Sequence, residues 1–181
     1  MFSSATVNWS TPQKFFDQYN QKYQFTLDVC ALPENAKCPV YFTPDDDGLK
    51  QTWEGVVWMN PPYGKKIPQW IEKAFQEANC TKTTVVSLLP ARVDTRWFHN
   101  HIYNKCGVEI EFIKGRLKFG DAKNSAPFPS MVVVFNHVLT HQFSIAEVGK
   151  VQLRSNQSTG GSEMGHLFIF SPYPQTLYQI Q

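Results

Sequence analysis

The chain has 181 residues, of which 42% are hydrophobic, and it carries a formal net charge of +2. This length suits one domain with a sizeable hydrophobic core, and the mildly basic charge permits a nucleic-acid partner without indicating one. No apolar run is long enough to cross a membrane, and the N-terminal residues have neither the basic nor the apolar region of a signal peptide. We therefore expect a cytosolic protein.

The first predicted elements are a short helix and a strand. Thr11 is a candidate cap for a helix that begins at Pro12, because threonine is favoured at the capping position and proline at the first helical position. The apolar run FTLDVCA (25–31) contains Asp28 and ends in small residues, which predicts the first strand. A loop rich in proline, asparagine and aspartate follows from 32 to 48.

Strands and helices then alternate along the chain. Apolar runs predict further strands over 55–59, 83–90, 108–114 and 130–135, and helical spacing predicts helices over 67–79 and 95–106. This alternation of strands and helices predicts an α/β fold with a parallel, doubly wound sheet. We assign residues 1–140 to this domain and residues 141–181, with one more candidate strand at 166–170, to a C-terminal extension packed on it.

The four cysteines form no Cys-x-x-Cys pair and have no spacing typical of a zinc site. We expect them to be reduced, buried thiols rather than disulfides or metal ligands.

The stretch VVWMNPPYG (56–64) contains the candidate catalytic residues. Ligands of open α/β sheets bind beyond the carboxyl ends of the strands, which is where Asn60 is expected. Pro61 and Pro62 hold the backbone extended and give the Pro61 carbonyl a fixed direction. The Asn60 side-chain oxygen and the Pro61 carbonyl are then two acceptors beside the ring of Tyr63. This arrangement suits a planar group that bears an NH2, although a plain strand-ending turn is the alternative.

Methylation of an aromatic amine such as that of adenine requires such an arrangement. The nitrogen lone pair is delocalised into the ring, and two acceptors that each take one N–H favour a more tetrahedral nitrogen. Asn60 can accept a hydrogen bond but cannot take the proton. Positioning and electrostatics would then supply most of the rate.

The sequence Asn60-Pro61-Pro62-Tyr63 matches the [DNS]-P-P-[YFW] signature of amino-methyltransferases, and the chain resembles the phage-encoded Dam-like DNA adenine methyltransferases. The resemblance covers about residues 9 to 135, in the segments WSTPQKFF, FTLDVCALPENAKC, YFTPDDDGL, WEGVVWMNPPYG, VVSLLPARVDTRWFH, FIKGRLKFG and APFPSMVVVF. It implies a Rossmann-like methyltransferase sheet with helices on both faces. It also implies site-specific methyl transfer from S-adenosylmethionine to N6 of a flipped adenine on which Tyr63 stacks.

The resemblance also implies a cofactor site. Thr11 and Pro12 would hold the methionine part, Asp28 would belong to the cofactor loop, and Asp46 is our choice from the acidic run 45–47 for the ribose or adenine. Helix capping and a solvated turn are the plain alternatives for Thr11 and for the acidic run. The segment LDVCAL (27–32) lacks the glycine-rich turn that most methyltransferases carry at this point.

Basic residues follow three of the predicted strands. Lys65, Arg92 and Arg116 are candidate contacts to the phosphates of double-stranded DNA, with an ordinary charged surface as the alternative. The family resemblance suggests a phage or prophage origin and action in a bacterial cytoplasm. We expect no metal ligands in the site. The sequence does not indicate which DNA sequence is recognised or what the oligomeric state is.

Two other kinds of function remain at this point. Cytosine, adenine in RNA and a glutamine side chain of a protein also present a planar NH2, so a related amino-methyltransferase is one alternative. The missing glycine turn leaves a second alternative, a non-enzymatic nucleic-acid-binding module with a degenerate cofactor site.

Overall fold

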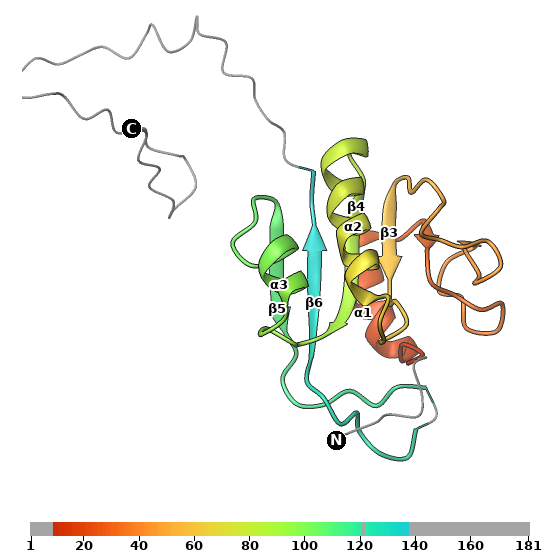
Figure 1. Cartoon of the computed structure of the whole chain (residues 1–181). Helices are drawn as coiled ribbons and strands as arrows, with labels where there is room; N and C mark the ends of the chain where they lie inside the picture. The colour runs from red at the N-terminus through yellow and green to blue at the C-terminus, as the bar shows by residue number, and fades with distance from the viewer. Residues whose placement is uncertain (1–8, 121, 138–181) are drawn as a thin grey trace, which may run out of the picture. The chain divides into compact units, whose positions relative to one another are not determined.

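The structure is a computed structural model that describes residues 9–120 and 122–137 (Figure 1). These residues form an α/β unit whose elements, in chain order, are α1 (Gln13–Tyr23), β1 (Leu27–Asp28), β2 (Val40–Tyr41), β3 (Val56–Met59), α2 (Ile67–Thr81), β4 (Thr84–Pro90), α3 (Arg96–His101), β5 (Val108–Phe112) and β6 (Ser130–Phe135). The expected C-terminal extension 141–181 and its candidate strand 166–170 lie outside the described residues.

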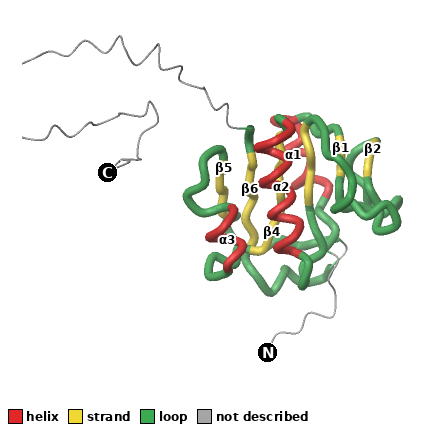
Figure 2. The backbone as a smooth tube through the Cα atoms, turned by 45° about the horizontal axis from the view of Figure 1, so that its top comes forward, coloured by secondary structure: helices red, strands yellow, loops and turns green. Residues whose placement is uncertain are grey.

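The six strands form one mixed sheet in the order β2-β1-β3-β4-β6-β5, which Figure 2 shows from β2 at the right to β5 at the left. The strands β2, β1, β3 and β4 are parallel, but β6 runs antiparallel to both of its neighbours. The prediction of a parallel sheet is therefore wrong for β6. All six residues of β6 are buried, and a strand buried on both faces has the continuous apolar sequence typical of parallel strands.

Helices cover both faces of the sheet, as predicted for a Rossmann-like methyltransferase. Neighbouring residues of a strand point to opposite faces: Val57 and Met59 pack in the core with α2 and α3, whereas Trp58 packs with Phe16 and Tyr19 of α1. The segment that joins β5 to β6 completes the second layer on the α1 side.

Several predicted boundaries shift. The strand β1 keeps only Leu27 and Asp28 of the predicted 25–31, α3 ends at His101 rather than at 106, and β2 was not predicted. The strand β2 has two residues inside a polar loop, which is too short for an alternation pattern to show.

The helix α2 agrees with its prediction because its apolar stripe is regular. Ile67, Trp70, Ile71, Ala74 and Ala78 are buried on one side of it, and Pro68 falls in its first turn. Within the described residues, no helix is long and apolar enough to span a membrane.

The four cysteines are all free thiols, and Cys38 is buried and Cys30 half-buried. Cys80 and Cys106 are exposed, so the expectation of buried thiols is wrong for these two. No group of three or more metal-ligating side chains gathers in the described part of the chain.

Candidate active site

A cavity of about 270 Å³ lies at the carboxyl ends of β1 and β3. The chain leaves β1 towards β2 on one side and places β3 on the other side, so this is the point where the strand order reverses and where open α/β sheets bind ligands. The lining comes from residues 9–11, from 28–32, from the loop after β2, from Asn60–Pro62, and from Trp70 of α2.

The amide of Asn60 has a defined orientation at this cavity. Its Nδ2 donates to the carbonyl of Trp9 at 2.5 Å and to the Thr11 hydroxyl at 3.0 Å. A carbonyl can only accept, so the nitrogen faces Trp9, and Oδ1 points the other way. That oxygen is buried and has no hydrogen-bond partner among the described residues. An unpaired buried acceptor is costly, so Asn60 presents an oxygen that an N–H donor would satisfy.

Pro61 is buried and Pro62 exposed, and both line the cavity next to Asn60. Among the described residues, no hydrogen bond reaches the Pro61 carbonyl. The predicted pair of acceptors, Asn60 Oδ1 and the Pro61 carbonyl, is therefore present with neither oxygen occupied.

Tyr63 is held in place by a hydrogen bond of its hydroxyl and by aromatic contacts of its ring. Its hydroxyl donates to the carbonyl of Leu88 in β4 at 3.0 Å, and burial raises the pKa of that hydroxyl well above its usual value. Its ring meets Phe119 and Phe128 edge-on, with centroid distances of 6.2 and 5.5 Å. The ring is half-buried beside the cavity rather than in its lining, and its stacking on a base stays a prediction.

Thr11 does not cap α1, because the capping position belongs to Pro12, whose carbonyl accepts from the N–H groups of Phe15 and Phe16. The buried Thr11 hydroxyl binds Asn60 and lines the cavity instead. Pro12 lies outside the lining. The link between Thr11 and Asn60 spans 49 residues, so no local pattern in the sequence could have indicated it.

Asp28 holds the loop after β1, where the sequence has no glycine-rich turn. Its Oδ1 accepts from the N–H of Cys30 at 3.2 Å and its Oδ2 from the N–H of Lys37 at 3.0 Å. Burial raises the pKa of this carboxyl, and the two N–H groups and the Lys37 charge oppose the rise. Asp28 lines the cavity, where it orders the loop over residues 29–37 without any glycine.

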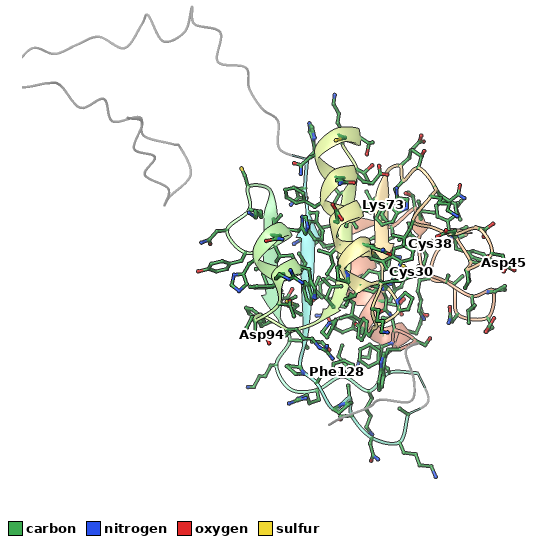
Figure 3. All side chains as sticks on the ribbon, viewed as in Figure 1. Cys30, Cys38, Asp45, Lys73, Asp94 and Phe128 are labelled. Carbon is green, nitrogen blue, oxygen red and sulfur yellow. The ribbon has the colours of Figure 1, made fainter. Side chains whose placement is uncertain are left out.

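The acidic run contributes Asp47 rather than Asp46 to the cavity. Asp46 Oδ2 accepts from the backbone N–H of Thr43 at 2.8 Å and from its hydroxyl at 2.7 Å, and these bonds hold the pKa of Asp46 below its usual value. Asp46 is thus an exposed turn residue. Asp47 pairs with Lys50 at 3.0 Å, which lowers its pKa too. Figure 3 shows Asp45 on the outer side of this turn, far from Cys30.

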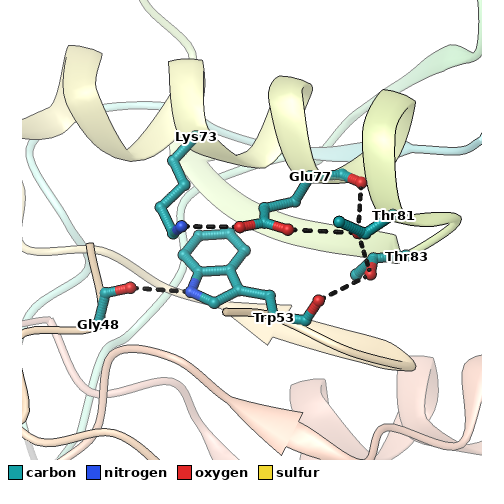
Figure 4. Close-up of polar contacts among 6 residues, drawn as sticks. All are labelled: Gly48, Trp53, Lys73, Glu77, Thr81 and Thr83. Carbon is teal, nitrogen blue, oxygen red and sulfur yellow. Dashed lines mark hydrogen bonds and ion pairs between the residues drawn. The ribbon is translucent and has the colours of Figure 1, made fainter. Parts of the chain in front are cut away.

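The part of the cavity lining formed by Gly48 is held by a partly buried network of contacts between Trp53 and α2 (Figure 4). The Gly48 carbonyl accepts from Trp53 Nε1 at 2.8 Å. The Trp53 ring lies under the ammonium of Lys73, which pairs with Glu77 at 2.7 Å. Hydrogen bonds through Thr81 and Thr83 return from Glu77 to the Trp53 carbonyl, so the network closes on itself.

The three basic residues predicted to contact DNA lie at the Asn60 end of the sheet. Lys65, Arg92 and Arg116 follow β3, β4 and β5, and these strands run in one direction because β4 and β5 are both antiparallel to β6. All three are exposed. The ion pairs within the described residues involve Lys50 and Lys73 instead, so these three cations have no carboxylate partner there. Their contact with DNA stays a prediction.

Sequence reasoning missed other cavity residues, among them Trp9, Asn35, Lys37, Lys66 and Trp70. Asn35 and Lys37 belong to the polar loop after β1, whose composition signals only a turn.

Comparison with known proteins decides the family. The family model described as DNA N-6-adenine-methyltransferase (Dam) matches residues 3–160. The chain belongs to the Dam family. It is 32% identical over 136 residues to the DNA N-6-adenine-methyltransferase of Haemophilus phage HP1 (strain HP1c1), which covers 70% of this chain and 77% of that protein. It is 35% identical over 63 residues to the putative methyltransferase YfdM of Escherichia coli (strain K12), covering 30% of this chain and 69% of that one.

Membership of the Dam family confirms the predicted enzyme class, methylation of adenine N6 in DNA. It also implies a methyl donor. The role of the unpaired Asn60 oxygen as an acceptor for the adenine amine stays a prediction.

Proposed function

We propose that this Dam-family protein transfers a methyl group from S-adenosylmethionine, bound in the cavity at β1 and β3, to N6 of an adenine in double-stranded DNA held at Asn60. The observation that carries this proposal is the fixed Asn60 amide, whose buried Oδ1 has no partner within the described residues.

The residues of the cavity fit S-adenosylmethionine. Phe42, Leu49 and Trp70 offer apolar surface for the adenosine part, and Asp47 offers a carboxylate for ribose hydroxyls. The polar residues Thr11 and Lys37 line the cavity as well. When bound, this cofactor supplies an electrophilic methyl group on a positively charged sulfur.

The residues around Asn60 prepare the amine for attack. Asn60 Oδ1 accepts one N–H of the adenine amine and the Pro61 carbonyl accepts the other, which localises the nitrogen lone pair. Thr11 and the Trp9 carbonyl hold the amide so that Oδ1 cannot rotate away. Since an amide oxygen takes no proton, the proton leaves after the nitrogen has gained the methyl group, and the rate comes from positioning.

Adenine in a duplex must leave the base stack to reach this site, at a cost of a few kcal/mol. Phosphate contacts from Lys65, Arg92 and Arg116 would offset part of that cost. The ring of Tyr63 would stack on the extruded base next to Asn60. The likeness to a phage protein supports action on DNA in the cytoplasm of a bacterial host.

The test is methyl transfer from labelled S-adenosylmethionine to unmethylated duplex DNA, with the product nucleoside identified by mass spectrometry. We expect N6-methyl-2′-deoxyadenosine from the wild type and none from Asn60→Ala. The matched control is Asn79→Ala, an exposed asparagine of α2 outside the cavity, which should methylate like the wild type. Methylated cytosine, or activity in Asn60→Ala, would contradict the proposal.

A further inference from the structure

We infer that Lys37 binds the carboxylate of the amino-acid part of the methyl donor. This inference rests on the proposed function, because it takes S-adenosylmethionine as the occupant of the cavity.

Lys37 is held at the cavity by two contacts. Its backbone N–H donates to Asp28 Oδ2 at 3.0 Å, and its Nζ donates to Gln13 Oε1 at 2.8 Å. The residue is half-buried and belongs to the cavity lining. Gln13 is the first residue of α1, so the ammonium stays between the loop after β1 and the start of this helix, where the positive end of the helix dipole adds to its charge.

The ammonium of Lys37 has no carboxylate within ion-pair distance among the described residues, and its partner Gln13 is neutral. Two carboxylates line the cavity. Asp28 uses one oxygen for each of two backbone N–H groups, and Lys37 acts on it only across a longer distance. Asp47 pairs with Lys50. The Lys37 ammonium therefore has no counter-ion among the described residues, and an anionic group on the ligand would supply one.

The orientation of the cofactor points to the same residue. The reacting methyl group must lie near Asn60, whose amide is hydrogen-bonded to Thr11. Thr11 lies two residues before the start of α1 at Gln13. The amino-acid end therefore fits on the α1 side. Asp47 and Gly48 belong to the acidic turn, and Gly48 packs against the Trp70 ring, so this part of the lining suits the adenosine part.

Two lysines line this cavity, and only one is on the α1 side. Lys66 lies at the start of α2, and its charge adds to the Lys50 hydrogen bond that lowers the pKa of Asp47. It also lines a second surface depression together with Asp47 and Lys50. Lys66 therefore belongs to the adenosine end, and Lys37 is the cation at the amino-acid end.

The test measures binding by calorimetry, without DNA. The two ligands are S-adenosylmethionine and its decarboxylated form, which keeps the sulfonium and the amine but lacks the carboxylate. A charge-assisted bond to the carboxylate predicts that the wild type binds the full cofactor about 10- to 100-fold more tightly than the decarboxylated form. In Lys37→Met this ratio should fall to about threefold or less, and Lys37→Arg should restore most of it.

Lys14→Met is the matched control, since Lys14 is an exposed lysine of α1 outside the cavity lining, and it should keep the wild-type ratio. Circular dichroism establishes that each variant is folded. A full wild-type ratio in folded Lys37→Met would overturn the inference and leave the cofactor assignment standing. Failure of the folded wild type to bind S-adenosylmethionine would overturn the cofactor assignment, and the inference with it.

Discussion

Asn60 shows how one side chain is selected by its immediate contacts. The family signature admits aspartate, asparagine or serine at this position, but here the group facing the Trp9 carbonyl must be a donor. Trp9 lines the cavity and packs edge-on against Phe119 and Phe128, as Tyr63 does. The residue type thus follows from the contact with Trp9 as much as from the reaction.

Asn60→Asp is therefore expected to be defective although aspartate satisfies the signature. A carboxylate oxygen would replace Nδ2 at 2.5 Å from the Trp9 carbonyl, and two acceptors in contact repel one another. We expect a loss of about 1–3 kcal/mol in stability and a methylation rate at least about tenfold lower. The rate should recover in part at low pH, where the protonated carboxyl can donate to Trp9. A variant as active as the wild type at neutral pH would contradict this reading.

Asp28 gives a prediction about pH. Its pKa in the folded protein is raised above the usual 3.8, so the folded state keeps the proton longer as pH rises. The stabilisation that this proton brings is complete below the unfolded value and is lost as pH rises through the raised pKa. Asp28→Asn removes this titration, and it also turns an amide NH2 towards one of the two backbone N–H groups.

We expect Asp28→Asn to be less stable than the wild type by about 1–3 kcal/mol, with a deficit that shrinks as pH rises above 3.8. Urea unfolding of both proteins between about pH 4 and 7 measures the difference, with the linear dependence on denaturant giving each free energy. A deficit that stays constant over this range would show that Asp28 does not titrate as the structure indicates.

At the scale of elements, the turn before β3 and the helix α2 meet at Gly48. A Cβ at this position would lie 2.5 Å from the carbonyl oxygen of Val29 and 3.0 Å from the Trp70 ring. Gly48 thus allows the acidic turn to approach both β1 and α2, and the network from Trp53 to Glu77 fixes that approach.

The added methyl group in Gly48→Ala should therefore push the acidic turn, which lines the cavity, away from Val29 and Trp70. We expect a loss of about 1–3 kcal/mol in stability together with weaker binding of S-adenosylmethionine by calorimetry. The control is Gly115→Ala, where φ is +84° but no atom lies within 4 Å. That variant should lose about 1 kcal/mol through backbone strain and bind the cofactor normally. Equal cofactor binding by both variants would contradict the role of Gly48.

Local sequence patterns predict the bounds of some helices and strands but not of others. The stripe of α2 and the apolar run of β4 were predicted nearly to their ends, because each is long and regular. The two-residue strands β1 and β2 have their hydrogen-bond partners far along the chain. Their extent depends on those partners rather than on their own sequence.

At the scale of the whole molecule, the sheet brings basic residues from three separate loops to one end. Figure 1 shows that the segment between β5 and β6 reaches the same end as the loop after β3. A duplex at this end would meet Lys65, Arg92 and Arg116 beside the site.

Arg116→Gln is expected to weaken binding to duplexes of any sequence by a similar factor, and to reduce the slope of log K against log salt by about 1. Lys82→Gln is the matched control, because Lys82 is exposed at the end of α2 and precedes β4, at the opposite end of the sheet. Fluorescence anisotropy at several salt concentrations measures both variants. An unchanged slope in Arg116→Gln, or an equal loss in Lys82→Gln, would place the DNA elsewhere.

The sequence by itself determined that the chain folds as an α/β unit and that Asn60, Pro61, Pro62 and Tyr63 follow a buried strand. Apolar periodicity and proline stiffness act within a few residues, so they can be read locally. Only the tertiary structure decided that β6 runs antiparallel, that Thr11 binds Asn60, and that Asp47 rather than Asp46 reaches the cavity. These features depend on contacts between residues far apart in the chain, and local sequence patterns do not indicate such contacts.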